Sequence, residues 1–398
     1  MAPAELLPEL WDAVFEFVYD LRPWHAFDDG ATGKERRNHR LTARNRLSSI
    51  MLVSKLWYSI ASPFAWRDLT LSLRATGPRS PLPQSARVSA GLTRTLHLVY
   101  FLKLEADFRQ LVSNMTALRE LSCPSLEPND VTALEEACGS SLTTLCLRGP
   151  NSTLLRSPKF FALQELQISY LPIGSGPTGF VLLLDLPQLV YLAVANLRII
   201  PAQDTPATPG NTRYPALRRL RMLGVGWPRD QTAEALQSFF VTHGAQLSHY
   251  RMSGIISQPF FTTVSGHFSN LQHLSCTTLD TVFCIRYYPP SIRTLEMCCH
   301  WRTDLVVEPS SRNGQCRLEA FFDEILRLAR AETLQLQRFV IKGISWSGTY
   351  DQVRATTIQS LQGVAVELFK LGTTVEDENG VALHNAPIDI LGLDDDDR

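Results

Sequence analysis

The segment Leu217-Arg218-Arg219-Leu220-Arg221-Met222 is one copy of a six-residue phrase that decides the fold of this chain. The phrase has apolar residues at its first, fourth and sixth positions and variable residues between them. This alternation is typical of a short strand with one buried face. Eight copies occur, at residues 118–123, 142–147, 163–168, 189–194, 217–222, 247–252, 271–276 and 292–297.

The copies follow one another at steps of 21 to 30 residues, measured between their fourth positions. A leucine-rich repeat has a similar period of about 20–29 residues. A weaker phrase at 95–98 begins the predicted array, and another at 336–341 ends it. Helical patterns occur at 105–115, 129–138, 232–244, 317–331 and 350–371.

These patterns predict an α/β fold, with a leucine-rich-repeat solenoid that carries a parallel sheet on its concave side and helices or irregular turns outside. The alternative is an irregular α/β protein that is merely rich in leucine. It stays open because most copies lack the Asn or Cys position typical of the repeat. The helix predicted at 350–371 would cover the open end of the array.

Two further stretches, near the N-terminus, have helical periodicity. Apolar residues recur at helical spacing over 7–18 and again over 47–61. Pro8 suits the first turn of the first helix, where its missing N–H costs nothing. Glu9 complements the positive end of that helix.

The residue types in these stretches resemble an F-box. Leu7-Pro8 opens the first helix, Val53-Ser54-Lys55-Leu56-Trp57 lies in the second, and Pro63-Phe64-Ala65-Trp66 closes the module. The resemblance implies a helical module that docks the Skp adaptor, and through it the cullin, of a cullin–RING (SCF-type) ubiquitin ligase. The adaptor-binding positions it implies are Leu7, Pro8, Leu10, Trp11, Val14, Leu52, Val53, Trp57 and Trp66.

On this resemblance the chain is a non-catalytic substrate-recognition subunit, whose repeats bind an unknown protein substrate. The alternative is a leucine-rich-repeat interaction scaffold without a ubiquitin-ligase role, in which the F-box-like helices cap the array. The predicted domains are the module at 1–75, a linker at 76–90, the array at 91–342, a C-terminal cap at 343–385 and an acidic tail at 386–398.

The module departs from the family in a charged insert at 22–45, between its first two helices. This insert contains the basic run at 34–40 and little apolar content. We interpret it as a solvated surface loop, with a nuclear-import signal as the alternative.

Basic side chains lie on or beside the predicted strands, at Arg119, Arg218, Arg219, Arg221, Arg251 and Arg293. His249 and His273 occupy the same variable position of successive copies, so they are predicted to line one patch of the concave face. A partly basic surface of this kind would suit acidic substrate peptides. The predicted substrate-binding residues are Arg119, Arg219, His249, His273 and Arg293.

Charge and composition exclude several classes of function. The 38 Lys and Arg nearly balance the 39 Asp and Glu, so neither nucleic acid nor an anionic membrane is an expected partner. Without a secretory signal, the eight cysteines are expected to be reduced in an intracellular protein, cytoplasmic or nuclear. No apolar run reaches the roughly 18 residues of a membrane span.

No arrangement of residues typical of an enzyme is found. The sequence has no glycine-rich phosphate loop and no Gly-x-Ser-x-Gly elbow. Cys298-Cys299-His300 has zinc-ligand residue types, but neighbours on a strand point to opposite faces, which favours packed or interface cysteines. We therefore predict a non-enzymatic chain with no cofactor and no metal.

Overall fold

The fold is described from a computed structural model of the chain. It describes residues 51–53, 55, 58, 61–62, 64, 66–71, 90–98, 105–124, 126, 128–147, 160–168, 186–195, 214–223, 237, 239–252, 258–276, 286–298, 317–346, 348–350 and 352–390. Two compact units divide the chain: unit 1 is Met1–Arg148 with Lys159–Leu163, and unit 2 is Gly149–Pro158 with Gln164–Arg398. Among the described helices, none has the length and apolar character needed to cross a membrane.

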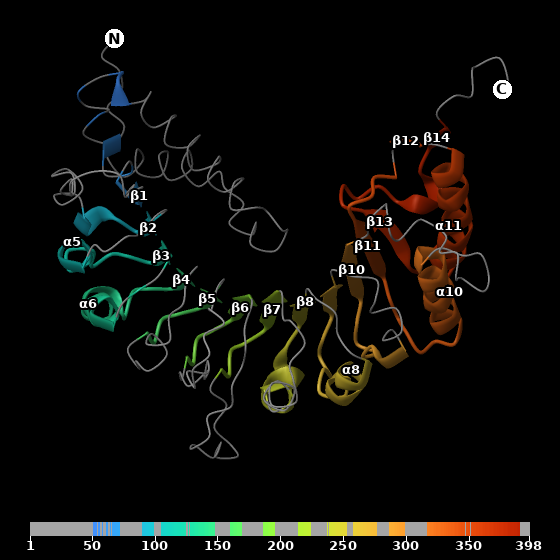
Figure 1. The fold of residues 1–398 in the computed structure, drawn as a ribbon, viewed down its shortest axis with the longest axis horizontal. Coiled ribbons are helices and arrows are strands. Elements are labelled where there is room, and N and C mark those ends of the chain that lie inside the picture. The colour runs from blue at the N-terminus through green and yellow to red at the C-terminus, as the bar shows by residue number, and fades with distance from the viewer. Residues whose placement is uncertain are drawn as a thin grey trace, which may run out of the picture. The chain divides into compact units, whose positions relative to one another are not determined.

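Unit 1 contains four parallel strands among its described residues, each paired with the next in sequence. Its elements are β1 (Asp68–Leu71), η2 (Ala90–Leu92), β2 (Thr95–Leu98), α5 (Glu105–Val112), β3 (Glu120–Cys123), α6 (Pro128–Cys138) and β4 (Thr144–Leu147). Helices α5 and α6 lie on the same side of these strands (Figure 1). The buried side chains of β3 and β4 are Leu121, Cys123, Leu145 and Leu147.

Unit 2 continues the same architecture with eight parallel strands that again pair in sequence order. These strands are β5 (Glu165–Ile168), β6 (Tyr191–Ala195), β7 (Arg219–Leu223), β8 (His249–Met252), β9 (His273–Cys276), β10 (Thr294–Cys298), β11 (Arg338–Lys342) and β13 (Thr374–Asp377). The other elements are η4 (Gly244–Gln246), α8 (Gln258–Ser265), α10 (Arg317–Arg330), β12 (Gly348–Tyr350), α11 (Gln352–Lys370), η6 (Leu383–Asn385) and β14 (Ile388–Ile390). Strands β12 and β14 form a separate parallel pair.

One backbone contact repeats from strand to strand. The carbonyl oxygen just before a strand accepts hydrogen bonds from two consecutive N–H groups of the next turn. In unit 2, Val190 accepts from Arg218 and Arg219, and Arg218 in turn accepts from Ser248 and His249, at 2.9–3.1 Å. The same contact occurs in unit 1, where Arg94 and Thr95 donate to Arg67. It satisfies polar groups between strands and sets the register.

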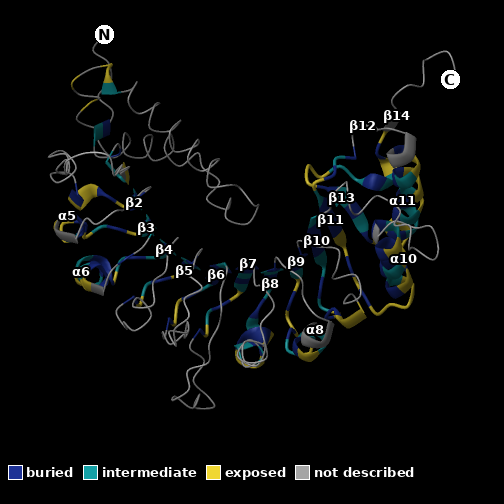
Figure 2. Ribbon diagram, viewed as in Figure 1, coloured by how far each residue is buried: buried dark blue, intermediate teal, exposed yellow. Residues whose placement is uncertain are grey.

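The apolar positions of the phrase form the core. In β5, β7 and β8 the second and fourth residues are buried and the others are half-buried (Figure 2). Tyr250 takes a position that leucine holds in most strands, and its ring packs 5.5 Å from Phe240 and 5.6 Å from Phe268. On β11, Phe339 packs against Phe321 and Phe322 of α10, which places α10 on this buried face. Helices α8 and α10 lie on one face of this sheet (Figure 1).

The predicted α/β class with a parallel sheet is confirmed, and strand pairing in sequence order is compatible with a solenoid. The helices predicted at 105–115, 129–138, 317–331 and 350–371 correspond to α5, α6, α10 and α11. The strand pairing extends further than the phrases at 95–98 and 336–341. Strand β1 pairs with β2, and β13 pairs with β11. One edge strand therefore comes from the segment assigned to the module and the other from the segment assigned to the cap.

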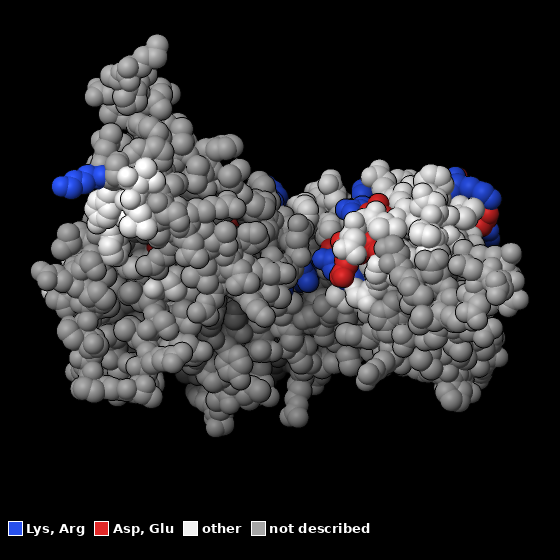
Figure 3. All heavy atoms as spheres, turned by 90° about the horizontal axis from the view of Figure 1, so that it is seen from above, with Lys and Arg blue, Asp and Glu red and all other residues white. Residues whose placement is uncertain are grey.

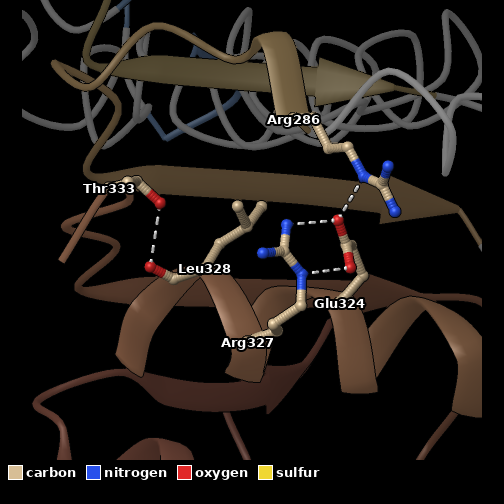
Figure 4. A network of polar contacts seen from close by, with 5 residues as sticks. All are labelled: Arg286, Glu324, Arg327, Leu328 and Thr333. Atoms are coloured by element: carbon tan, nitrogen blue, oxygen red, sulfur yellow. Dashed lines mark hydrogen bonds and ion pairs between the residues drawn. The ribbon is translucent and has the colours of Figure 1, made fainter. Parts of the chain in front are cut away.

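A charged contact network fixes α10 to the turn before β10. Glu324 accepts hydrogen bonds from Arg286 Nε at 2.7 Å and from Arg327 Nε and Nη2 at 2.8 Å (Figure 4). The pKa of Glu324 is lowered to about 2, mainly by its hydrogen bonds from Arg327. Burial opposes this shift, and Arg286 adds to it. At the end of the helix, Thr333 Oγ1 donates to the Leu328 carbonyl at 3.1 Å (Figure 4).

Candidate recognition surface

The candidate surface is the face of the unit 2 sheet opposite α8 and α10, called the open face here. Because strand side chains alternate, every second residue of each strand points to it. Strand register places these residues in two rows. The first row is Glu165, Tyr191, Arg219, His249, His273, Thr294, Arg338 and Thr374; the second is Gln167, Ala193, Arg221, Arg251, Ser275, Glu296, Val340 and Glu376.

Three of the predicted substrate-binding residues lie together on this face. Arg219, His249 and His273 are consecutive in the first row. The two imidazole rings stack with their centroids 5.3 Å apart and 22° between their planes. Ser248 Oγ lies 2.9 Å from His249 Nδ1 and fixes the orientation of that ring. The sequence-based expectation that the two histidines line one patch matches this geometry.

The other two predicted residues lie elsewhere. Arg119 belongs to unit 1, where it is exposed and precedes β3. Arg293 precedes β10, outside both rows, and its Nη1 donates to the Gln335 carbonyl at 3.0 Å and to Gln335 Oε1 at 2.9 Å. The hydrogen bonds of Arg293 to Gln335 give it a structural role in holding the segment before β11.

A buried carboxylate, Glu296, lies in the second row beside the histidines. It accepts from Ser275 Oγ at 3.1 Å, pairs with Lys342 Nζ at 2.7 Å and lies 3.6 Å from His273 Nε2. Burial raises its pKa, but His273, Lys342 and the charge of Arg251 outweigh burial and hold the pKa at about 2. Glu296 is therefore an anion whose polar contacts come from the two neighbouring strands, β9 and β11.

Two arginines, Arg221 and Arg251, are register partners in the second row. The Nε–H of each is buried and has no hydrogen-bond partner among the described residues. Both guanidinium groups act on Tyr191. Burial raises the pKa of Tyr191, and a hydrogen bond with Arg221 and the charges of Arg221 and Arg251 oppose that rise. The charge of Arg251 also lowers the pKa of Glu296. In the strand order, β8 with Arg251 lies between β6 with Tyr191 and β10 with Glu296.

Towards β13 the charges of the open face are paired. Arg338 Nη2 and Nε each lie 2.7 Å from Glu376 Oε2. In the space-filling view from above, basic and acidic side chains of unit 2 lie next to one another (Figure 3). In contrast, the described open-face positions of β6 to β9 include three arginines and two histidines but no acid.

Tyr191 and Glu296 were not among the residues selected from the sequence. Each occupies a variable position of a strand phrase, where an aromatic or acidic residue is ordinarily exposed. Aligning the phrases position by position would have placed both residues beside the basic side chains. Their burial could not have been found in this way, because it depends on neighbouring strands.

Part of the predicted adaptor-binding set is described. Leu52 is 87% exposed, Val53 is 66% exposed and the nearby Tyr58 is 55% exposed, whereas Ala61 and Phe64 are buried. Trp66 is half-buried, and its carbonyl accepts a hydrogen bond from Thr93 Oγ1 at 3.2 Å. The remaining positions of this set lie outside the described residues: Leu7, Pro8, Leu10, Trp11, Val14 and Trp57.

Within the described part of the chain, no cluster of three His, Cys, Asp or Glu side chains could hold a metal ion. Cys298 is half-buried at the end of β10, and burial raises the pKa of its thiol. Cys299 and His300 lie outside the described residues.

No family model and no curated protein matches the chain.

Proposed function

We propose that the chain is a non-catalytic substrate-recognition subunit of a cullin–RING ubiquitin ligase. In this proposal an F-box-like segment in unit 1 docks the Skp adaptor, and the open face of unit 2 binds the protein substrate. The two activities use different residues, so each can be tested separately.

The observation that supports docking is the exposed apolar side chains of Leu52, Val53 and Tyr58. They belong to the stretch whose residue types resemble an F-box, and two of them are positions that the resemblance assigns to the adaptor. Neighbouring residues Ala61 and Phe64 are buried in the chain itself. Large apolar side chains left in water beside a packed segment are typical of a protein–protein contact.

A second candidate function, an interaction scaffold, is favoured by a different observation. Arg67 directly follows the F-box-like stretch, and its carbonyl accepts hydrogen bonds from Arg94 and Thr95 at 2.8–2.9 Å. Strand β1 then joins the sheet. These contacts suit a segment that caps the array. They also mean that deleting residues 1–71 removes a paired strand under either proposal, so point substitutions discriminate better than a deletion.

Co-purification of the full chain with the Skp adaptor tests the docking proposal. The substitutions Leu52→Asp and Val53→Asp place charge on the exposed apolar side chains, and the combined variant is expected to weaken adaptor binding at least tenfold. Val241→Asp is the matched control, because Val241 is also an exposed valine (55%) but lies in unit 2. A second variant, Leu7→Ala with Pro8→Ala, tests the first helix of the resemblance.

Docking is supported if the wild type and Val241→Asp bind the adaptor and the other two variants do not. It fails if the folded wild type does not bind, or if both variants bind as the wild type does. In that case the scaffold function is preferred.

A further inference from the structure

Two large apolar side chains are left in water at the end of α11. Phe369 is 51% exposed, and Leu371, directly after the helix, is 47% exposed. The other large exposed apolar residues described in unit 2 are Val241, before β8, and Tyr287, before β10. A single exposed apolar side chain is ordinary on a protein surface, whereas adjacent ones indicate a contact surface.

The packing of α11 within the chain does not account for this exposure. The helix lies against α10 and against the last strand of the sheet, β13 (Figure 1). Its described buried residues are Ala355, Ile358, Leu361, Ala365 and Leu368. Elements at the end of a strand array ordinarily present a polar outer surface, because nothing further packs on them. The end of α11 departs from this rule.

The phenyl ring of Phe369 is held in place by His384. The two rings stack, with centroids 4.1 Å apart and 17° between their planes. His384 is half-buried in η6, where the residue before it, Leu383, is fully buried. A side chain that is already oriented loses little conformational freedom when a partner binds. Phe369 is therefore suited to act as an aromatic anchor, the kind of residue that supplies much of the energy of a protein interface.

The charges beside these apolar residues have both signs. Glu367 lies 2.7 Å from Lys370 Nζ and 3.5 Å from Arg330 Nη2. The side chain of Glu367 is 42% exposed, and those of Lys370 and Arg330 are 64% and 60% exposed, so all three are accessible to a partner. A partner with one sign of charge would be attracted by one group and repelled by another. A second copy of the same surface avoids this conflict, because a twofold rotation can bring the acid of one copy to the bases of the other.

We propose that the end of α11 is the contact surface of a symmetric dimer of this chain, with Phe369 and Leu371 at its centre and Glu367, Lys370 and Arg330 at its rim. Each copy covers the apolar side chains of the other with the same patch. Two anchors per copy make a small interface, so the dimer is expected to be weak, with a Kd on the order of 1–100 µM.

The dimer would carry two docking segments and two open faces. It would therefore hold a partner with several binding segments more tightly than a single chain does. This consequence rests on the proposed function, whereas the dimer itself does not.

Sedimentation equilibrium of the full chain from about 1 to 200 µM tests the proposal. The wild type is expected to pass from monomer to dimer in this range and to form nothing larger, because a twofold interface closes. Phe369→Ser with Leu371→Ser should weaken the dimer at least tenfold. Val241→Ser is the matched control, because Val241 is 55% exposed in the same unit but lies before β8. It should dimerise as the wild type does.

A charge exchange tests the same surface without changing its apolar residues. Glu367→Lys makes the rim basic, and Arg330→Glu with Lys370→Glu makes it acidic. Each variant alone should dimerise at least tenfold more weakly than the wild type, because like charges then meet across the twofold axis. An equimolar mixture of the two variants should form a heterodimer at least as tight as the wild-type dimer. This recovery separates the loss of a contact from the loss of folding, because a misfolded variant would not regain binding.

Several results would overturn the proposal. A wild type that stays monomeric over the whole range excludes the dimer, and the patch would then belong to a different partner. A dimer that the double serine variant leaves unchanged excludes this surface. Species that keep growing with concentration, or a mixture of charge variants that stays monomeric, exclude the symmetric arrangement. None of these measurements uses the adaptor, so a failure of adaptor binding leaves their outcome unaffected.

Discussion

At the residue scale, Glu296 connects the charges of the open face. Its carboxylate contacts side chains from three other positions, Ser275, Lys342 and His273, on the two neighbouring strands. A buried carboxylate is tolerated only with such partners, because its desolvation is otherwise unfavourable. Arg251 also acts on this carboxylate, which is therefore shared among basic groups of nearby strands.

Glu296→Gln keeps the shape of the side chain and removes its charge. Lys342 then lies on a half-buried surface without its counter-ion, so the free energy of unfolding should fall by about 1–3 kcal/mol. Chemical denaturation measures this difference. Glu324→Gln is the control: the partners of Glu324, Arg286 and Arg327, are 65% and 55% exposed, so solvent screens that network and the loss should be smaller. Equal losses would contradict the buried role of Glu296.

His243 is expected to make stability depend on pH. It is buried against Phe239 and Tyr214, with ring centroids 4.8 and 5.2 Å away, and burial lowers its pKa from 6.5 to about 4. Below about pH 6.5 the unfolded chain therefore binds a proton at this residue that the folded chain excludes. The free energy of unfolding should fall between pH 6.5 and 4, by at most about 1.4 kcal/mol per pH unit.

Denaturation at a series of pH values, compared with His243→Phe, isolates this contribution. The ring of Phe suits the aromatic surroundings and cannot be protonated. We expect the difference between wild type and variant to change over pH 6.5 to 4 and to be constant above it. A constant difference over the whole range would mean that His243 is protonated equally in both states.

At the scale of single elements, α10 and α11 end in the same way with different residues. In each case the backbone N–H of a threonine three residues past the last helical residue donates back to a leucine carbonyl: Thr333 to Leu328 at 3.1 Å, and Thr373 to Leu368 at 2.9 Å. This ending needs a left-handed residue just before the threonine. Gly372 supplies it after α11 with φ 87°, whereas Glu332 adopts φ 56° after α10.

This difference allows a paired stability experiment. A left-handed conformation costs a non-glycine residue about 1–2 kcal/mol, part of which glycine loses again in unfolded-state entropy. Glu332→Gly should therefore stabilise the chain by about 0.5–1 kcal/mol. Gly372→Ala should destabilise it by a similar amount through backbone strain alone, because a Cβ there meets no atom within 4 Å. Melting temperatures of the two variants should move in opposite directions; movement in the same direction contradicts the explanation.

Most strands and helices were predictable from local patterns, because apolar residues alternate along a strand and recur every three to four residues along a helix. Strand β13 was not, because its sequence Thr374-Val375-Glu376-Asp377 has one apolar residue and its second buried position is Asp377. That carboxylate is acceptable in the core only through backbone N–H groups of Trp346, Asn379 and Val381. The bond from Trp346 joins segments that lie 31 residues apart, and it leaves no local sequence pattern.

The candidate site was predictable to a similar extent. His249 and His273 could be placed side by side because they share one position of the phrase, and strand register is set by the repeat. The buried state of Glu296 and the unpartnered Nε–H groups of Arg221 and Arg251 could not be predicted. They depend on which side chains three or four neighbouring strands bring together.

At the scale of the whole molecule, the proposed function needs two binding surfaces on one chain. The exposed Leu52 and Val53 belong to unit 1, and the basic side chains of the open face belong to unit 2. A receptor of this kind acts by holding two partners at once, so neither binding measurement alone tests it. The two surfaces are expected to act independently, because substitutions at distant sites without shared partners are usually additive.

A bridging capture measures the central claim most directly. Beads that carry the purified Skp adaptor are incubated with the purified full chain and then with a cell lysate, and the retained proteins are identified by mass spectrometry. We expect the wild-type chain to stay on the beads and to retain further proteins. Leu52→Asp with Val53→Asp should remove both the chain and those proteins, whereas Arg219→Glu with Arg251→Glu should leave the chain on the beads without them. Beads that do not retain the wild-type chain, or that retain the same proteins with every variant, would contradict the proposed function.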